Sequence, residues 1–212
     1  MTNNITEKIN IIYNRLSIRY NSKIELNYTS SIELLIATML SVQCTDKVVN
    51  RVTDKLFKKY KNIYDYANAD ITELKNDIKA VGLFNKKAEN IINSCKTIIK
   101  EYNSKVPNSL EDLIKLNGIG RKIANIILSN IYNINEGIAI DTHMLRINYR
   151  LGIITSNKYA NQAERELMEI LPRNLWNEYT YLIINHGRLI CLARKPKCDI
   201  CFLNDICSKN GV

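Results

Sequence analysis

The sequence predicts an all-α fold, for three reasons. Apolar residues recur at helical spacing along most of the chain, as Ile5, Ile9, Ile12 and Leu16 do near its start. The alternation of apolar and polar residues that is typical of strands is almost absent. Ser, Thr, Asp or Asn precedes several of the periodic segments, where such a residue can cap a helix. With 212 residues, the chain can form one large domain or two smaller ones, each with its own core.

The expected helices follow one another with short connections. The second of them, which begins near Ser30, is apolar on nearly every side over residues 32–40, so we expect it to be buried. Gly82 and Gly152 are expected to follow helix ends, because glycine readily adopts the left-handed conformation found there. The helices are expected near residues 5–16, 30–41, 46–56, 71–81, 88–102, 109–115, 122–128, 142–151, 163–171 and 179–191.

The charge of the chain points to a polyanionic partner. The formal net charge is +9 at pH 7 and the pI is near 9.2, which suits a protein that binds nucleic acid. A basic chain would also suit a protein of the membrane surface or the ribosome. The sequence contains no apolar run long enough to span a bilayer, and its first residues do not resemble a signal peptide. We therefore expect a soluble cytoplasmic protein with no membrane partner.

Residues 116–122, with the sequence Leu-Asn-Gly-Ile-Gly-Arg-Lys, lie between two of the expected helices. Gly118 and Gly120 allow a tight turn in which another backbone can come close. The free N–H groups of the turn and the N-terminus of the following helix can bind an anion, and Lys122 adds a positive charge. In a basic protein, the natural anion is a nucleic-acid phosphate. A Gly-x-Gly turn between helices is common, however, and does not establish DNA binding by itself.

The six cysteines are unevenly distributed. Cys44 and Cys95 lie in apolar helical surroundings and are expected in the core. The other four have the spacing Cys-x6-Cys-x2-Cys-x5-Cys near the end of the chain, and they are Cys191, Cys198, Cys201 and Cys207. In an intracellular protein, such a group favours a metal site over disulfides. Four thiolates can bind a tetrahedral zinc ion or a [4Fe–4S] cluster, and the spacing alone does not decide between them.

Three parts of the chain together resemble the endonuclease III family of DNA glycosylases. Residues 116–124 match the family's hairpin, Leu-Pro-Gly-Val-Gly-Arg-Lys-Thr-Ala, except that Asn117 replaces the usual Pro and Ile123 the frequent Thr. Asp141, within Ala-Ile-Asp-Thr-His, stands where the family has its catalytic aspartate. The spacing of the clustered cysteines and the sequence Ala-Arg-Lys-Pro-Lys-Cys at residues 193–198 match the family's iron–sulfur loop. The resemblance extends over nearly the whole chain.

The resemblance implies a helix-hairpin-helix DNA glycosylase fold made of two all-α domains. One is a six-helix domain over residues 22–133 that contains the hairpin. The other is discontinuous, combines residues 1–21 with residues 134–212, and holds a C-terminal [4Fe–4S] cluster loop. Double-stranded DNA that contains a damaged base or an abasic site would bind in the cleft between the domains. We expect a monomer that works on the nucleoid in the cytoplasm of a bacterium.

The resemblance also assigns roles to individual residues. Lys122 would be the catalytic nucleophile and Asp141 the catalytic carboxylate, although Asp141 could simply cap a helix. Burial, together with the charge of Arg121 and the helix N-terminus, would favour the neutral amine of Lys122. Leu83 would be a wedge beside the flipped nucleotide, and without the resemblance it would be read as an ordinary apolar contact. The expected DNA contacts are Gln43, Leu83, Leu116, Gly118, Gly120, Arg121, Arg194, Lys195 and Lys197, and the expected [4Fe–4S] ligands are Cys191, Cys198, Cys201 and Cys207.

The activity implied by the resemblance is base excision repair by a bifunctional DNA glycosylase and AP lyase. Lys122 would attack C1′ of an oxidised or ring-saturated pyrimidine nucleotide flipped out of the helix, form a Schiff base, and allow β-elimination 3′ to the abasic site. Two alternatives remain. A monofunctional, adenine-removing glycosylase would lack the lysine, and a non-catalytic DNA-binding module would not need both Lys122 and Asp141.

Overall fold

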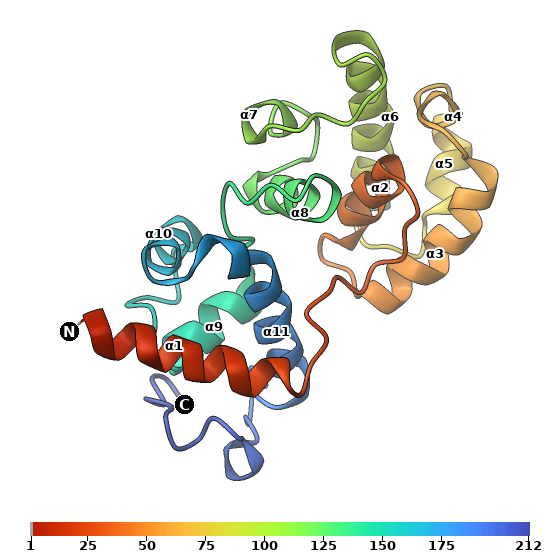
Figure 1. Cartoon of the computed structure of the whole chain (residues 1–212). Helices are drawn as coiled ribbons and strands as arrows, with labels where there is room; N and C mark the ends of the chain where they lie inside the picture. The colour runs from red at the N-terminus through yellow and green to blue at the C-terminus, as the bar shows by residue number, and fades with distance from the viewer. Residues whose placement is uncertain (1) are drawn as a thin grey trace. The chain divides into compact units, whose positions relative to one another are not determined.

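The computed structural model describes residues 2–212, with side chains from residue 5 onward, and every regular element in this range is helical (Figure 1). The all-α prediction is confirmed. Two short 3₁₀ helices are η1 (Arg173–Leu175) and η2 (Cys198–Ile200). The α-helices are α1 (Thr2–Ser17), α2 (Ser31–Ser41), α3 (Asp46–Lys59), α4 (Ile63–Ala67), α5 (Ile71–Asp77), α6 (Phe84–Glu101), α7 (Leu110–Leu113), α8 (Arg121–Ile131), α9 (Thr142–Arg150), α10 (Ala160–Ile170) and α11 (Trp176–Leu189). None of these described helices combines the length and the apolar character needed to cross a membrane.

The chain divides into two compact units. The continuous unit consists of residues 25–134 and contains α2 to α8. The discontinuous unit consists of residues 1–24 and 135–212 and contains α1, α9, α10 and α11. Helix α1 contacts α10 and α11, so helices from the two ends of the chain pack together within one unit.

Helix α2 is the centre of the continuous unit. Residues 34–40 of α2 are all buried, and the helix contacts α3, α6 and α8, so the prediction of a buried second helix is confirmed. Ser30 caps α2 by accepting a hydrogen bond from the backbone N–H of Glu33 at 3.2 Å. Thr38, a polar residue in the buried run, donates to two backbone oxygens of the preceding turn. Because its hydroxyl is satisfied within the helix, Thr38 can be buried without an unpaired polar group.

The end of α5 differs from the prediction. Helix α5 ends at Asp77, well before Gly82, and the φ of Gly82 is not in the left-handed region. The expectation that Gly82 follows a helix end is therefore wrong. The reason lies in Ile78 and Val81, which are both buried and turn the chain into the core before the glycine is reached.

Two other local features of the continuous unit also differ from the prediction. Helix α4 was not expected, although Asn62 and Asp65 form a reciprocal capping box at its start. Cys44 is only partly buried, because it lies in the turn that follows α2. Cys95, in contrast, is fully buried in α6, as expected.

The core of the discontinuous unit contains the apolar stripe expected near the start of the chain. Ile9, Ile12 and Leu16 of α1 are buried with side chains of α9, α10 and α11. Gly152 has a φ of 71° just after α9, so the predicted helix end at this glycine is confirmed. A Cβ atom on Gly152 would also lie 2.4 Å from Oγ of Ser208, so a larger residue there would have to displace the Ser208 side chain.

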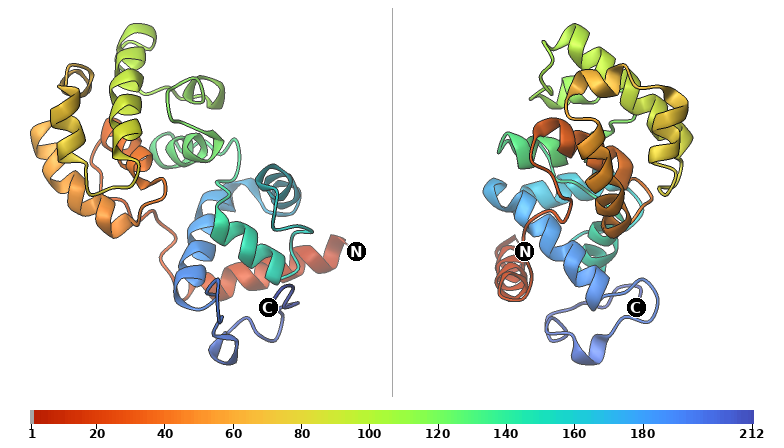
Figure 2. Two further views of the ribbon diagram at one scale, coloured as in Figure 1. Left: turned by 180° about the vertical axis from the view of Figure 1, so that it is seen from behind. Right: turned by 90° about the vertical axis from the view of Figure 1, so that its right-hand side faces the viewer.

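The segment that follows α11 closes the discontinuous unit by running back past α1 (Figure 2). Leu203 in this segment is fully buried in the core. The guanidinium of Arg15 donates to the carboxylate of Asp205 at 2.6 and 2.9 Å. Nζ of Lys8 donates to Oγ of Ser208 at 3.1 Å. The C-terminal segment is therefore anchored along the length of α1.

Candidate functional site

The segment between α7 and α8 forms the hairpin that the sequence predicts. Ser109 caps α7 by accepting a hydrogen bond from the N–H of Asp112 at 3.2 Å. Gly118 has a φ of 78°, and a Cβ atom there would lie 2.5 Å from Nδ2 of Asn90 on α6. Glycine adopts this backbone conformation without strain and leaves room for the Asn90 side chain. The position of the hairpin against α6 is therefore fixed at Gly118.

Helix α8 begins with an open N-terminus. Gly120 is its exposed N-cap residue, and a Cβ atom on Gly120 would meet nothing within 4 Å. Because Gly120 has no side chain to cap the helix, the N–H groups of the first turn are accessible to an anion. Arg121 is exposed at the same end. Leu116 differs, because it is 2% exposed and its backbone N–H and oxygen are both hydrogen-bonded within the protein, to Leu113 and Ile119, so a DNA contact at Leu116 stays a prediction.

Lys122 is the second residue of α8, and its side chain is exposed. The side chains of its own unit therefore do not bury Lys122, and its expected burial stays a prediction. The physical reason is its place in the first turn, on the side of α8 opposite the buried residues Ile123, Ala124 and Ile127. The exposed position leaves the amine free to reach a bound molecule.

Asp141 caps α9, as expected. Its Oδ1 accepts a hydrogen bond from the backbone N–H of Met144 at 2.8 Å, and the residue is half-buried. The segment before it is held by Glu164, whose Oε1 accepts from the backbone N–H of Ile138 at 3.1 Å. Lys122 belongs to the continuous unit and Asp141 to the discontinuous unit. Their joint role in one reaction therefore stays a prediction.

Gln43 and Leu83 lie in neighbouring turns of the continuous unit. Gln43 follows α2 and Leu83 precedes α6, and both side chains are exposed, that of Leu83 at 59%. Both have a left-handed backbone, with φ values of 53° and 60°, which residues other than glycine rarely adopt. A Cβ atom on Gly82 would lie 3.6 Å from the backbone oxygen of Gln43, so the two turns are adjacent. Strained, exposed turns of this kind are typical of functional surfaces.

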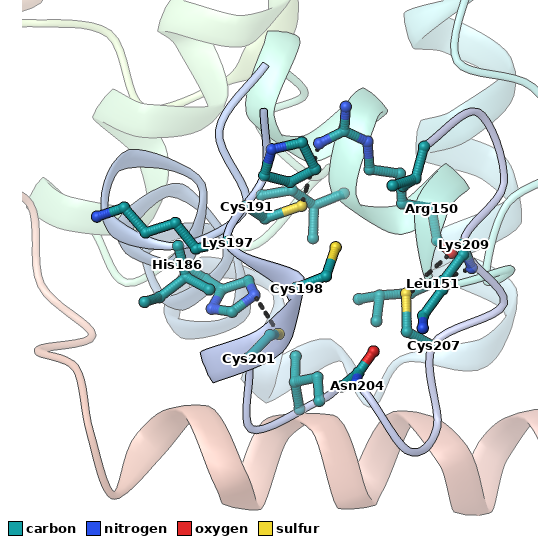
Figure 3. Close-up of a pocket in the computed structure, with 15 residues that line it drawn as sticks. Arg150, Leu151, His186, Cys191, Lys197, Cys198, Cys201, Asn204, Cys207 and Lys209 are labelled. Carbon is teal, nitrogen blue, oxygen red and sulfur yellow. Dashed lines mark hydrogen bonds between the residues drawn. The ribbon is translucent and has the colours of Figure 1, made fainter. Parts of the chain in front are cut away.

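The four clustered cysteines surround one pocket of the discontinuous unit (Figure 3). Their side chains enter it from different sides, from the end of α11, from η2 and from the segment beyond. Among the described residues, no three His, Cys, Asp or Glu side chains lie close enough together to bind a single metal ion. A [4Fe–4S] cluster takes one thiolate on each of its four irons. Four cysteine thiols that line one pocket offer the donor set that such a cluster needs.

The residues around the cysteines were missed by sequence reasoning. Arg150, at the end of α9, is 7% exposed and donates to Sγ of Cys191 at 3.3 Å and to the backbone oxygen of Leu192 at 2.7 Å. His186 of α11 is 2% exposed, and its Nε2 lies 3.6 Å from Sγ of Cys201. An arginine in the last turn of a helix and a histidine within a helix are ordinary in a sequence. Only the folded chain shows that both contact the cysteines.

Burial changes the acid–base properties of this pocket. It raises the pKa of the Cys201 and Cys207 thiols and lowers the pKa of His186 to about 4. His186 is therefore a neutral imidazole at physiological pH. The hydroxyl of Tyr20 lies 3.2 Å from Nδ1 of His186, on the ring side away from Cys201. Because metal ligation requires thiolates, metal binding here releases protons from these two partly buried thiols.

Residues 191–197 form a loop between α11 and η2. Arg150 holds the start of this loop through the Leu192 oxygen, and the N–H of Lys197 donates to the backbone oxygen of Ile190 at 3.0 Å. Its exposed basic side chains are those of Arg194, Lys195 and Lys197. The loop therefore presents three cationic side chains on a backbone that is held at both ends.

Two family matches cover the elements described above. Residues 36–173 match the HhH-GPD superfamily of base excision DNA repair proteins, a range that includes the hairpin and the Asp141 cap. Residues 191–207 match the iron–sulfur binding domain of endonuclease III. This second match begins at the first of the four clustered cysteines and ends at the last.

Similar proteins cover most of the chain. Endonuclease III of Synechocystis sp. is 40% identical over 173 residues, which are 82% of this chain and 78% of that protein. Endonuclease III of Haemophilus influenzae is 38% identical over 190 residues, which are 90% of this chain and 85% of that protein. A solved structure of a trapped endonuclease III–DNA covalent intermediate matches with a TM-score of 0.91 and 36% identity, and covers 97% of this chain and 96% of that chain. A non-covalent endonuclease III–DNA complex matches with a TM-score of 0.92, with the same identity and coverage.

The fold, the hairpin and the cysteine loop thus all agree with membership of one family. The predicted helix-hairpin-helix glycosylase fold, the binding of DNA and the [4Fe–4S] cofactor are confirmed, and zinc is set aside. The chain belongs to the endonuclease III family of the HhH-GPD superfamily, whose members are base excision repair DNA glycosylases with AP lyase activity.

Proposed function

We propose that this protein is a bifunctional DNA glycosylase that removes oxidised or ring-saturated pyrimidines from double-stranded DNA and cleaves abasic sites, with Lys122 as its nucleophile. The observation that carries the proposal is the exposed position of Lys122 in the first turn of α8, beside a hairpin open to phosphate. A lysine amine can form a Schiff base with a sugar, which a monofunctional glycosylase does not do. The trapped covalent intermediate of a related endonuclease III with DNA supports a nucleophile of this kind.

The proposed reaction begins when the damaged nucleotide leaves the base stack. The neutral amine of Lys122 forms a bond to C1′ while the bond between C1′ and the base breaks, and the base leaves with the electron pair and takes up a proton. The sugar ring then opens, and the new C–N bond becomes a Schiff base. Loss of a C2′ proton expels the 3′ phosphate, which nicks the strand by β-elimination.

The Asp141 carboxylate acts from the second unit. Its negative charge stabilises the positive charge that develops on the sugar as the base departs. It also accepts the proton that the lysine amine must lose. One of its oxygens is held by the Met144 N–H, so the carboxylate is oriented before a substrate binds.

The duplex is held at three places. The N–H groups of the hairpin at Gly118 and Gly120, with Arg121, bind a phosphate close to the reacting nucleotide. Gln43 and Leu83 enter the duplex and occupy the space that the flipped nucleotide leaves. The exposed loop after α11 binds phosphates farther along through Arg194, Lys195 and Lys197.

The cluster completes the discontinuous unit. We propose Cys191, Cys198, Cys201 and Cys207 as its ligands, because their thiols surround the same pocket. When bound, the cluster would supply iron–sulfur bonds that join the segment just after α11, η2 and the segment that follows η2. We further propose that the two units are the two domains of a monomer that acts on the bacterial chromosome in the cytoplasm.

Borohydride trapping tests the nucleophile, because reduction converts the Schiff base into a stable bond between protein and DNA. On duplexes with an abasic site or a ring-saturated pyrimidine, wild-type protein should be trapped. Lys122→Gln should not be trapped, while its affinity for the same DNA stays within about threefold of wild type. Lys115→Gln is the matched control, since Lys115 precedes the hairpin and is paired with Asp112 at 2.9 Å.

Two results would contradict the proposal. Undiminished trapping in Lys122→Gln would move the nucleophile elsewhere. Release of damaged purines, but not of damaged pyrimidines, across a panel of lesions would refute the proposed substrate class while leaving the nucleophile in place.

A further inference from the structure

Lys87, on α6, is a buried lysine that the steps above do not use. Its side chain is 5% exposed, and Nζ donates hydrogen bonds to the backbone oxygens of Leu40 at 2.8 Å and of Val42 at 2.7 Å. Lysine is almost never fully buried unless its charge is paired. Burial lowers the pKa of Lys87, so an ammonium group at this place depends on the two carbonyl oxygens that receive its protons.

The two carbonyl groups mark the C-terminal end of α2. Helix α2 ends at Ser41, and Val42 is its C-cap residue. The last carbonyls of a helix lack partners inside the helix and carry the negative end of its dipole. Lys87 satisfies two of these oxygens from the neighbouring helix. The next residue in the chain is Gln43, so Lys87 fixes the point from which the Gln43 turn departs.

The same residue also closes the first turn of α6. The backbone N–H of Lys87 donates to the backbone oxygen of Leu83 at 3.0 Å. The main chain of Lys87 therefore holds the Leu83 turn, while its side chain holds the Gln43 turn. Farther along α6, Oγ of Ser94 donates to the backbone oxygen of Asn117 in the hairpin at 2.8 Å. Helix α6 thus positions both turns and the hairpin of the continuous unit.

We propose that Lys87 is a positioning residue that sets the spacing between Gln43 and Leu83, so that these two side chains enter the duplex together when the damaged nucleotide leaves it. This inference rests on the function proposed above. Both turns have backbone conformations that persist only when the surrounding structure enforces them. Without the ammonium group, the end of α2 can move away from α6, and the two side chains no longer oppose the return of the base. The loss is greatest where a base pair must be opened and least where none exists.

Single-turnover excision on two substrates separates this role from a merely structural one. One substrate carries a ring-saturated pyrimidine in a fully paired duplex, and the other carries the same lesion in an unpaired bubble. With the cluster-loaded Lys87→Met protein at saturation, the rate should fall about tenfold or more on the paired lesion and less than about threefold in the bubble. The fluorescence of 2-aminopurine beside the paired lesion should also rise less, because fewer bases unstack.

The matched control is Lys86→Met, which changes the adjacent, exposed lysine of α6 and should behave as wild type on both substrates. Equal rate losses on the paired and bubble substrates, or an unaltered 2-aminopurine signal, would overturn the inference. If Lys87→Met does not fold, Lys87→Arg tests the inference instead. Arginine keeps the positive charge but does not fit between the two carbonyl groups as an ammonium group does. Lys87→Arg should therefore show the same bias between the paired and the bubble substrate. Wild-type protein that excises neither lesion would refute the proposed function, whereas active wild-type protein with unbiased variants would refute this inference alone.

Discussion

The carboxylate of Asp141 both caps a helix and, in the proposed reaction, supports a cationic sugar. Asp141→Asn separates the two roles, because the amide oxygen can still accept the hydrogen bond from Met144. The free energy of unfolding should change by less than about 1 kcal/mol. The rate of base excision should fall about a hundredfold or more, since an amide neither accepts the proton nor stabilises the charge. Thermal unfolding and single-turnover excision measure these two effects.

Asp70 provides a control for this prediction. It caps α5 in the same way, by accepting a hydrogen bond from the N–H of Glu73 at 2.8 Å. Asp70→Asn should leave both stability and excision close to wild type. Excision at nearly the wild-type rate in Asp141→Asn would show that capping is the whole role of Asp141.

Residues whose role depends on a local pattern could be found from the sequence, and residues whose role depends on tertiary contacts could not. The four clustered cysteines, and the glycines of the hairpin, are defined by spacing within a short segment. Other side chains contact groups that are distant in the sequence, and these are Lys87, Arg150 and His186. Lysine, arginine and histidine are ordinary residues in helices, so the sequence does not mark these three positions. Lys122 was located correctly on α8, but its exposure could not be read from its neighbours.

At the scale of elements, the loop of residues 191–197 can be tested as a phosphate contact. Lys195 is exposed there and has a left-handed φ of 52°. Each phosphate contact that is lost should flatten the slope of log K against log salt concentration by about 0.9. Lys195→Ala should therefore weaken binding to damaged and undamaged duplexes alike and flatten that slope, with no change in the excision rate of bound substrate. Fluorescence anisotropy at several salt concentrations measures the slope.

A lysine that is already paired on α3 serves as the comparison for Lys195. Lys58 is exposed and lies 3.1 Å from Asp54. Lys58→Ala should leave the salt slope unchanged. The same slope in Lys195→Ala as in wild type would exclude a phosphate contact at that residue.

Helices could be predicted where one segment contains its own signals. Helix α2 is apolar all round and was correctly expected to be buried, and Gly152 correctly marks the end of α9. The end of α5 was misplaced, because the burial of Ile78 and Val81 outweighs the preference of Gly82 for a helix end. Such competition between a local preference and tertiary burial is decided only in the folded chain.

At the scale of the whole molecule, the [4Fe–4S] cluster should stabilise one unit and not the other. The cysteines and the segment beyond them belong to the discontinuous unit, where Leu203 is buried in the core and Arg15 pairs with Asp205 at 2.6 Å. A ligand that binds only the folded state stabilises the part that it holds. Anaerobic removal of iron should therefore increase amide hydrogen exchange in α1, α9 and α11, while α2 and α6 stay protected.

Hydrogen-exchange mass spectrometry before and after chelation measures this difference, with iron analysis of the starting protein as a check. The untreated protein should contain about four irons per chain. The same chelator added to protein prepared without iron should change nothing, which controls for direct effects of the chelator. An equal loss of protection in both units would contradict a stabilising role confined to the discontinuous unit.

Because the discontinuous unit combines two separate parts of the chain, its helices are synthesised at different times. Helix α1 is synthesised before residues 25–134, which have a core of their own, and its partners α9, α10 and α11 emerge only after those residues. During that interval Ile9, Ile12 and Leu16 lack the side chains that bury them in the folded unit, and apolar surface exposed in this way favours aggregation. Lys8 and Ser208 are within hydrogen-bonding distance, so α1 and the C-terminal segment lie side by side. A circularly permuted gene that begins at the continuous unit and ends with α1 would then deliver α1 last, directly onto its finished binding surface.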